Sequence, residues 1–212
     1  MRTPGARPAE ATRWWWIRHA PVPDPEGRIL GQLDTACDTS DRDVFDVLAS
    51  RLPGGAVLIV TPLLRTRQTA DALELAGARL LPPEEEPAFL EQDFGHWQGR
   101  TWGALMTLTP PDQAVEAFWR SPGTTAPPAG ESFAMVMDRV ARAVEAWSAR
   151  LGVRDVVAIA HAGTIRAAVA QALGLSPDTA LRLVIDPQSL TRIDHFVASG
   201  GWAVRSMNET LP

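Results

Sequence analysis

A cation and an imidazole stand side by side where a predicted buried strand ends. Residues 14–17 are four large apolar residues, which favour a short buried strand, and Pro21 breaks its continuation. Arg18 and His19 follow this run directly. Ligands of open α/β sheets bind at strand ends, and a guanidinium offers a planar fork of donors to phosphate or carboxylate. The pair predicts an anion site, although a strand that merely ends in two polar residues is the simpler interpretation of this stretch alone.

A second cation, Arg65, is predicted in the first turn of a helix. Residues 56–60 are expected to form the second buried strand, and Thr61 and Pro62 are typical of an N-cap followed by proline at the first helical position. Arg65 is therefore expected beside free backbone N–H groups, at the positive end of the helix dipole, where anions bind. Arg67 lies on a different face and is interpreted as a structural or surface charge.

A second histidine, His161, ends a third apolar run at 155–160. Gly163 permits close backbone approach, and Thr164 is expected to open a helix over 165–173. A histidine at a strand end, followed by a helix N-terminus, again favours an anion. Two arginines and two histidines at one sheet edge predict a phosphate pocket that contains a nucleophile.

The candidate acid is Glu91, in an irregular stretch at 89–99 whose glycines and aromatic residues predict a shaped loop. Leu90 and Phe94 give this carboxyl group an apolar setting, which suits a general acid. A plain loop carboxylate is an equally good interpretation of this stretch alone.

The other candidate residues are assigned no chemistry. His195 alternates with Phe196 in a predicted strand and is expected to face solvent, and His96 lies in the aromatic loop. Cys37 is the single cysteine, which excludes an internal disulfide and a cysteine-based metal cage. No spacing of Asp and His suggests a site for a divalent metal.

The elements that must position these side chains alternate between apolar runs and amphipathic segments. Strands are expected at 14–17, 56–60, 80–81, 155–160, 189–197 and 201–207, and helices at 41–52, 63–73, 133–151 and 165–173. The stretch 96–130, broken by prolines and rich in aromatic residues, is interpreted as a helical lid over the site. Residues 1–12 are expected to be frayed.

Composition narrows the classes of protein. The chain has 212 residues, of which 45% are hydrophobic and 21% charged, as in ordinary globular proteins. A net charge of -5 and the lack of a basic run argue against a nucleic-acid partner. No apolar run is long enough to span a membrane, and residues 1–13 lack the apolar core of a signal peptide. We therefore expect a cytoplasmic protein.

Several segments together resemble one family. Arg18-His19-Ala20 is similar to the Arg-His-Gly signature of the histidine phosphatase superfamily, which includes the cofactor-dependent phosphoglycerate mutases. The segments that resemble the family's other blocks, in the right order, are 61–70, 91–99, 130–132 and 161–163, with Gly31, Asp34 and 208–210 at matching places. The resemblance runs from about residue 15 to residue 210, nearly the whole chain.

The resemblance implies a single domain over 1–212 of the phosphoglycerate mutase type. The fold would be a three-layer α/β/α sandwich with a mostly parallel central sheet and the small helical lid. By position, His19 would be the nucleophile and Glu91 the proton donor. Arg18, Arg65 and His161 would hold the phosphoryl oxygens, with Gly163 and Thr164 also binding substrate. Neither a metal nor another cofactor is implied.

Three departures from the family pattern stand out. Ala20 replaces the usual Gly and is expected to narrow the phosphate pocket. Gln98 stands where Glu is common, which is expected to affect packing more than chemistry. Val22 and Pro25 stand roughly where mutases place polar phosphate contacts, so any such contact must come from elsewhere.

The resemblance is nearest in motif shape to bacterial phosphatases of the α-ribazole phosphatase type. It therefore implies a phosphomonoesterase acting on a small phosphorylated metabolite, with α-ribazole 5′-phosphate as one candidate. The alternative is a 2,3-bisphosphoglycerate-dependent phosphoglycerate mutase, which is disfavoured by a short chain without a tail to close the site. A third hypothesis, an inactive member that binds a partner through the lid, is disfavoured because all five candidate catalytic residues are present. The oligomeric state stays open.

Overall fold

The computed structural model describes residues 10–24, 26–108 and 113–210. The strands are β1 (Thr12–Arg18), β2 (Val57–Val60), β3 (Glu84–Glu85), β4 (Asp155–Ala160), β5 (Leu190–Phe196) and β6 (Gly201–Glu209). The α-helices are α1 (Arg42–Arg51), α2 (Leu64–Leu75), α3 (Trp102–Met106), α4 (Gln113–Arg120), α5 (Phe133–Leu151), α6 (Ala162–Leu173) and α7 (Pro177–Ala180). Two 3₁₀ turns, η1 (Pro87–Phe89) and η2 (Gly95–Trp97), lie in the loop that carries Glu91. In the described part of the chain no helix is both long and apolar enough to cross a membrane.

One sheet runs through the molecule in the order β3-β2-β4-β1-β5-β6. Neighbours from β3 to β1 pair in parallel, and β5 and β6 continue the sheet antiparallel. In the central pair of strands, β1 and β4, Arg18 lies opposite Ala160. His19 and His161 each follow one residue later, so both lie at the same edge of the sheet. The expected mostly parallel sheet is confirmed, and its register brings the two histidines together.

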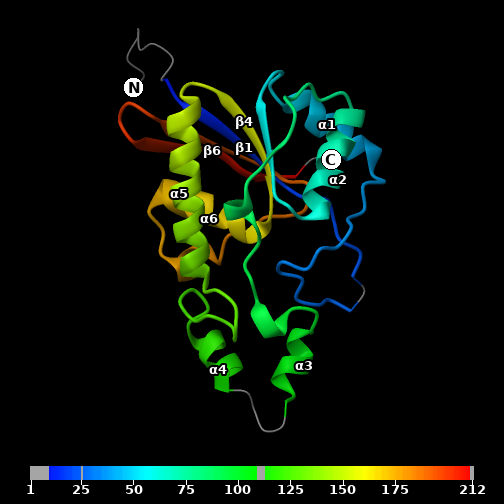
Figure 1. Cartoon of the computed structure of the whole chain (residues 1–212), viewed down its shortest axis with the longest axis vertical. Helices are drawn as coiled ribbons and strands as arrows, with labels where there is room; N and C mark the ends of the chain where they lie inside the picture. The colour runs from blue at the N-terminus through cyan, green and yellow to red at the C-terminus, as the bar shows by residue number, and fades with distance from the viewer. Residues whose placement is uncertain (1–9, 25, 109–112, 211–212) are drawn as a thin grey trace.

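Helices cover both faces of this sheet, with α5 and α6 on one side and α1 and α2 on the other (Figure 1). The alternation of side chains along β1 explains how one strand serves both layers. Trp14 and Trp16 point into the core beneath α5 and α6, where their rings stack 5.2 Å apart. Ile17 points into the core beneath α1 and α2. These are the three layers that the family resemblance implies.

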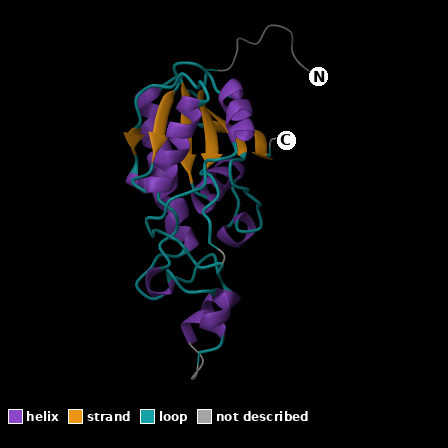
Figure 2. Ribbon diagram, turned by 90° about the vertical axis from the view of Figure 1, so that its right-hand side faces the viewer, coloured by secondary structure: helices purple, strands orange, loops and turns teal. Residues whose placement is uncertain are grey.

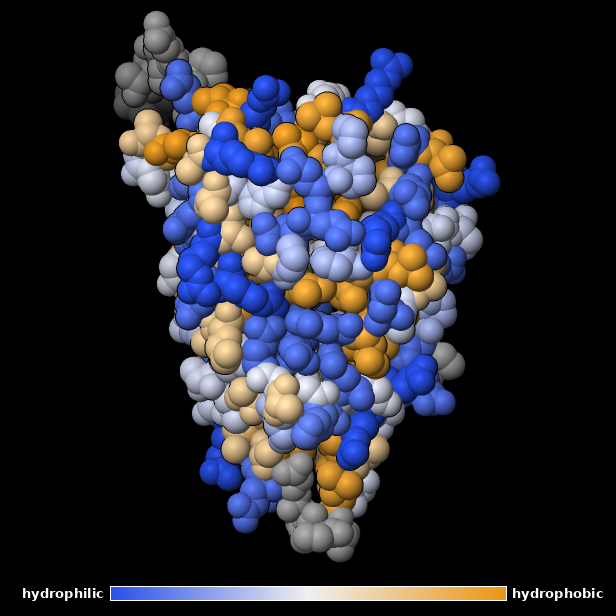
Figure 3. Space-filling model, in the orientation of Figure 1, coloured by the Kyte–Doolittle hydropathy of each residue, from blue (hydrophilic) through white to orange (hydrophobic). Residues whose placement is uncertain are grey.

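The helices α3 and α4 lie away from the sheet, at one end of the molecule (Figure 2). They enclose a small core of their own, which consists of Ile29, Trp97, Leu105, Val115 and Phe118. This is the helical insertion expected over 96–130, of which 109–112 lie outside the described residues. Apolar atoms also reach the surface at the α3 end (Figure 3), and Met106 is one of the exposed residues there.

Two expected helix starts are wrong. The N-cap of α2 is Leu63 rather than Thr61; the Thr61 hydroxyl contacts Thr66 and His161 and accepts only a long hydrogen bond, of 3.4 Å, from the N–H of Leu63. The helix α6 begins at Ala162, directly after the strand, and not at Thr164. Both errors have one physical cause: a hydroxyl that resembles a cap in sequence has a tertiary partner in the fold.

The predicted strand at 80–81 is also wrong. The edge strand is β3, at Glu84–Glu85, whose two exposed acidic residues pair with Ile59 and Val60 of β2. At the N-terminus, residues 1–9 of the expected frayed segment lie outside the described residues, whereas Thr12 already belongs to β1 and is fully buried. Whether two residues are apolar or polar says little about whether they form a short edge strand, because such a strand is defined only by its backbone pairing with a neighbour.

Candidate active site

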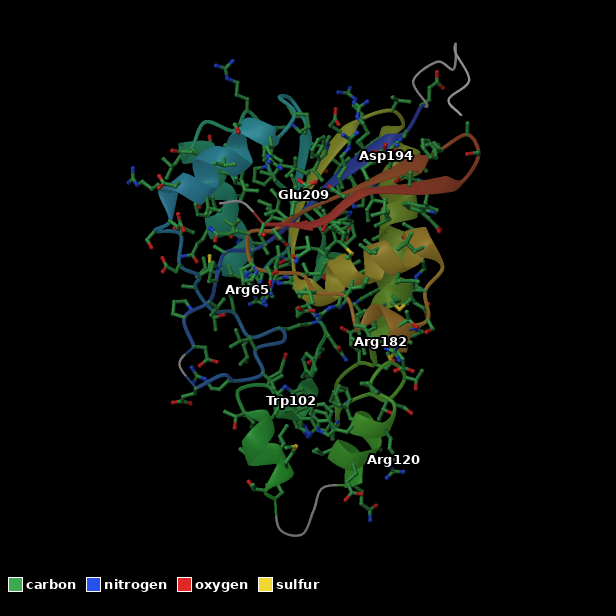
Figure 4. The ribbon with its side chains drawn as sticks, turned by 180° about the vertical axis from the view of Figure 1, so that it is seen from behind. Arg65, Trp102, Arg120, Arg182, Asp194 and Glu209 are labelled. Carbon is green, nitrogen blue, oxygen red and sulfur yellow. The ribbon has the colours of Figure 1, made fainter. Side chains whose placement is uncertain are left out.

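A cavity of about 370 Å³ opens at the sheet edge where β1 ends. The predicted residues that line it are Arg18, His19, Arg65 and Glu91. His161 lies behind this wall, with its ring centroid 5.1 Å from that of His19. Seen from behind, Arg65 marks the sheet side of the site and Trp102 the insertion side (Figure 4). The structure therefore brings together the five candidate catalytic residues.

His19 is held so that one ring nitrogen stays free. Its Nδ1 lies 2.7 Å from the backbone oxygen of Ala20, which can only accept, so Nδ1 carries the proton and Nε2 has the lone pair. Burial lowers the pKa of His19 to about 3, and the positive charges of Arg65 and Arg18 act in the same direction against the Ala20 hydrogen bond. The imidazole is therefore neutral at physiological pH, as a nucleophile must be.

His161 is fully buried at the N-cap position of α6. Its Nε2 lies 3.0 Å from the Thr61 hydroxyl, and its Nδ1 is buried without a hydrogen-bond partner among the described residues. Burial lowers the pKa of His161 well below its ordinary value, and the nearby His19 and Arg65 add to the effect. When the Thr61 hydroxyl is the donor of this hydrogen bond, the neutral ring carries its proton on Nδ1.

The two arginines are fixed by backbone oxygens rather than by acids. Arg65 donates to the carbonyl groups of Leu33 and Gly31, at 2.7 Å each, and only 1% of it is exposed. Arg18 donates to the carbonyl of Ile185 at 2.7 Å. The Nε of each is buried without a partner in the described part of the chain. Burial lowers the pKa of both, but a guanidinium stays protonated, so two positive charges are held in the cavity wall.

Glu91 reaches the site against the first turn of α6. The backbone N–H of Gly163 donates to both carboxylate oxygens, at 3.1 and 3.2 Å, and the N–H of Gln92 donates to one of them at 2.9 Å. Gly163, expected to bind substrate, therefore binds the carboxylate of Glu91 in this structure. Thr164 is fully buried and donates to the backbone oxygen of Phe89, so it holds the Glu91 loop and does not face the cavity.

Sequence reasoning missed an ion pair that fastens this loop. Arg139 of α5 pairs with Glu131 at 2.7 Å, and both side chains are largely buried. Arg139 also donates to the backbone oxygens of Ala88 and Glu91, while Glu131 accepts from the N–H of Asp93. A sequence signal for Glu131 existed, because the segment 130–132 resembles a block of the family pattern, but no role was predicted for it.

Two of the three departures from the family pattern have structural outcomes. Ala20 does not line the cavity: it is fully buried in the core beneath α1 and α2, so the expected narrowing is wrong. Gln98 accepts from the N–H of Gln32, at 2.5 Å, beside Gly31, and thereby shapes the loop whose carbonyl holds Arg65. Of the third departure, Val22 lines the cavity and Pro25 lies outside the described residues.

The residues expected to have no chemistry are placed as follows. Arg67 is exposed and pairs with Glu85 at 3.4 Å, which confirms a surface charge. His195 is half-buried, stacked on Trp202 with ring centroids 4.0 Å apart, so the expected solvent-facing position is wrong. His96 is exposed in its loop. Residues 10–24, 26–108 and 113–210 contain no cluster of three His, Cys, Asp or Glu side chains that could hold a metal.

Comparison with known proteins identifies the family. A family model described as histidine phosphatase superfamily (branch 1) matches residues 14–210. The chain is 33% identical over 174 residues to a glucosyl-3-phosphoglycerate phosphatase of Mycolicibacterium vanbaalenii, which covers 76% of this chain and 74% of that protein. The first curated relatives, which are mycobacterial, are 30% identical over 161 residues, and the match spans 76% of this chain but 43% of their length.

Solved structures show the same fold. A putative α-ribazole-5′-P phosphatase from Escherichia coli superposes with a TM-score of 0.80 at 22% identity, covering 94% of this chain and 97% of that one. A mycobacterial glucosyl-3-phosphoglycerate phosphatase in complex with VO3 gives 0.76 at 26% identity, covering 94% and 100%. The family match, the fold and the cluster of histidines and arginines agree: this chain belongs to the histidine phosphatase superfamily, branch 1.

Proposed function

We propose that the protein is a phosphomonoesterase that cleaves a small phosphorylated metabolite through a phosphohistidine formed on His19. The observation that carries this proposal is the state of His19: a buried, neutral imidazole with its Nε2 lone pair free, in one cavity wall with the guanidinium groups of Arg18 and Arg65. Phosphoryl transfer needs chiefly positioning and charge stabilisation, which such a pocket supplies. Since the arginines carry the positive charge, the proposed reaction requires no metal.

In the first proposed step, Nε2 of His19 attacks phosphorus and the bond from phosphorus to the alcohol oxygen breaks. Glu91, in its protonated form, gives its proton to that oxygen, so a neutral alcohol leaves. In the second step the Glu91 carboxylate takes a proton from water while the water oxygen attacks phosphorus. The P–N bond breaks, inorganic phosphate leaves, and His19 and Glu91 return to their starting states.

The charged and polar neighbours have separate roles in this mechanism. The guanidinium groups of Arg18 and Arg65, which line the cavity, hold the equatorial phosphoryl oxygens in this mechanism, together with His161. Because these donors are fixed by the backbone and by Thr61 before substrate binds, little reorganisation is needed when charge develops in the transition state.

The substrate is proposed at the level of a small phosphate monoester. α-Ribazole 5′-phosphate is one candidate, supported by the fold shared with a putative α-ribazole-5′-P phosphatase. A glucosylated phosphoglycerate is another, supported by the sequence similarity to the mycobacterial enzyme. The single-domain organisation expected over 1–212 is likewise a proposal, supported by the family match over 14–210.

The direct test is to trap the intermediate. The enzyme is mixed with phenyl phosphate, quenched in alkali within milliseconds, and the phosphorylated residue is located by mass spectrometry. We expect phosphate on His19 that survives alkali and is lost in acid, and we expect none in His19→Gln. The control His96→Gln, which changes an exposed histidine, should form the intermediate normally. Phosphate on another residue, or turnover in His19→Gln, would contradict the proposal.

The two alternative functions give different results in the same preparation. A phosphoglycerate mutase would interconvert 3- and 2-phosphoglycerate with little release of inorganic phosphate. An inactive, partner-binding protein would release no phosphate from any ester and would leave His19 unmodified. We expect phosphate release to exceed interconversion.

A further inference from the structure

A second cavity, of about 280 Å³, adjoins the first on the far side of Glu91. The two cavities share three lining residues: Glu91, Phe94 and Trp102. His19, Arg18 and Arg65 line only the first. Glu91 therefore lies between the first cavity, which contains the proposed phosphate-binding residues Arg18 and Arg65, and the second cavity, which does not. A general acid that protonates the leaving oxygen must occupy this boundary, with the phosphoryl group on one side and the alcohol on the other.

Aromatic rings of the insertion form one wall of the second cavity. Trp102 and Phe118 stack with ring centroids 5.6 Å apart, and Trp119 packs edge-on against Trp102 at 5.2 Å. Phe118 is buried in the small core of the insertion, whereas 53% of Trp119 is exposed. Such a wall offers flat apolar surface to the carbon part of a ligand.

The opposite wall carries Arg166, the one cation that lines this cavity. Arg166 lies on α6, one turn after Gly163, and its Nε donates to the carbonyl of Leu183 at 2.8 Å, which fixes the direction of the side chain. Within residues 10–24, 26–108 and 113–210 it makes no ion pair. In the described part of the chain its two Nη groups make no hydrogen bond, and the acidic charge that acts on the guanidinium is that of Glu91. A ligand can therefore still bind through the Nη groups.

Building on the proposed function, we propose that the second cavity binds the alcohol portion of the substrate and that Arg166 binds a carboxylate on it. The aromatic wall contacts the carbon skeleton that joins this carboxylate to the phosphate ester. One guanidinium fork matches one carboxylate in a bidentate arrangement, whereas a second phosphate would call for more than the single cation present here. The substrate class is thus a carboxylated phosphate monoester.

The test compares two esters that differ only in this charge: 4-carboxyphenyl phosphate and 4-carbamoylphenyl phosphate, with the 3-substituted pair to vary the reach. For the wild-type enzyme we expect kcat/KM about tenfold higher for the carboxylated ester of at least one pair, the size of a charge-assisted hydrogen bond. This measurement needs no variant. Equal kcat/KM values within both pairs would overturn the assignment.

Variants then locate the effect. In Arg166→Leu the preference for the carboxylated ester should disappear, and Arg166→Lys should recover part of it, because charge is restored without the fork. Arg182→Leu removes an equal charge from an exposed arginine outside the cavity and should keep the full preference. A preference that survives in Arg166→Leu, with its melting temperature confirming that it is folded, would contradict the role of Arg166.

The two proposals fail in different ways. If the phosphohistidine mechanism is wrong, neither ester modifies His19. If only the carboxylate site is wrong, both esters are hydrolysed through His19 without discrimination.

Discussion

The backbone N–H of Gly163 donates to both carboxylate oxygens of Glu91, at 3.1 and 3.2 Å. This contact needs a residue without a side chain, because a Cβ at position 163 would lie 2.2 Å from Oε1 of Glu91. The helix that begins directly after His161 thus also positions Glu91, and one short segment aligns two of the candidate catalytic groups.

Replacing this glycine should impair catalysis while leaving the fold intact. In Gly163→Ala the end of the Glu91 side chain must move, which costs little folding free energy but takes the carboxyl group away from the leaving oxygen. We expect kcat to fall about 100-fold with phenyl phosphate, within the range of general-acid catalysis. With 4-nitrophenyl phosphate, whose leaving group needs less protonation, the loss should be smaller.

A matched glycine separates this effect from a general one. Gly54 has open space around its would-be Cβ and an ordinary φ, so Gly54→Ala should be neutral. Equal losses of kcat for both esters in Gly163→Ala would show that the alanine acts on something other than proton donation.

The ion pair between Arg139 and Glu131 should matter for stability as well as activity. Arg139→Met leaves a largely buried carboxylate without its partner and removes the donors to two backbone oxygens of the Glu91 loop. We expect the free energy of unfolding to fall by about 2–3 kcal/mol, and kcat to fall by about tenfold because the loop is looser. Urea unfolding and steady-state kinetics measure the two effects.

Arg142→Met provides the comparison on the same helix. Arg142 is exposed, and α5 keeps its buried face in this variant, so the unfolding free energy should change by less than about 1 kcal/mol. If Arg139→Met lowered the free energy of unfolding no more than Arg142→Met does, the ion pair between Arg139 and Glu131 would not be what holds the Glu91 loop.

The sequence predicted well where the central strands end, because apolar runs and their ends are local signals. Residues 14–17 and 155–160 are apolar enough to specify buried strands, and the polar residues after each must then emerge at one edge. The supporting contacts are different in kind. Thr61, Thr164 and Arg139 each act through partners that are distant in sequence, at separations of 100, 75 and 51 residues respectively. No local pattern distinguishes them from a helix cap or a polar surface.

Acidification should destabilise the protein through His19. Its pKa is lowered from 6.5 to about 3 in the fold, so below pH 6.5 the unfolded chain binds a proton that the folded chain does not. The contribution of neutral His19 to the free energy of unfolding is therefore fully present above about pH 6.5 and is lost as the pH falls toward 3. The slope from this one group is at most about 1.4 kcal/mol per pH unit.

The measurement is the unfolding free energy of the wild type and of His19→Gln between pH 7 and 4. The variant should lose stability less steeply, although it retains the similar contribution of His161, whose pKa is also lowered by burial. His96→Gln, at an exposed position, should follow the wild type. Parallel curves for wild type and His19→Gln would mean that the His19 ring is not buried in its neutral form.

The last prediction concerns a pair that does not itself line the cavity but holds Arg18 in place. Asn208, in β6, donates from Nδ2 to a carboxylate oxygen of Asp186 at 2.8 Å and accepts from the backbone N–H of Asp186 at 2.6 Å. The neighbouring carbonyl of Ile185 receives the Arg18 guanidinium, and the N–H of Gln188 donates to the backbone oxygen of Arg18. The pair therefore fixes the turn that orients Arg18, which we propose binds the phosphoryl group.

Asn208→Asp places two carboxylates together and removes the side-chain donor, so it should weaken binding of inorganic phosphate and lower kcat/KM by about tenfold, the value of one charged hydrogen bond. The exchange Asp186→Asn with Asn208→Asp restores one donor and one acceptor across the pair, with the total charge unchanged, and should recover most of the loss. Product inhibition by phosphate and kcat/KM report on Arg18 directly. A double variant no better than Asn208→Asp alone would mean that position 208 affects the enzyme by another route, such as its left-handed backbone conformation at φ 52°.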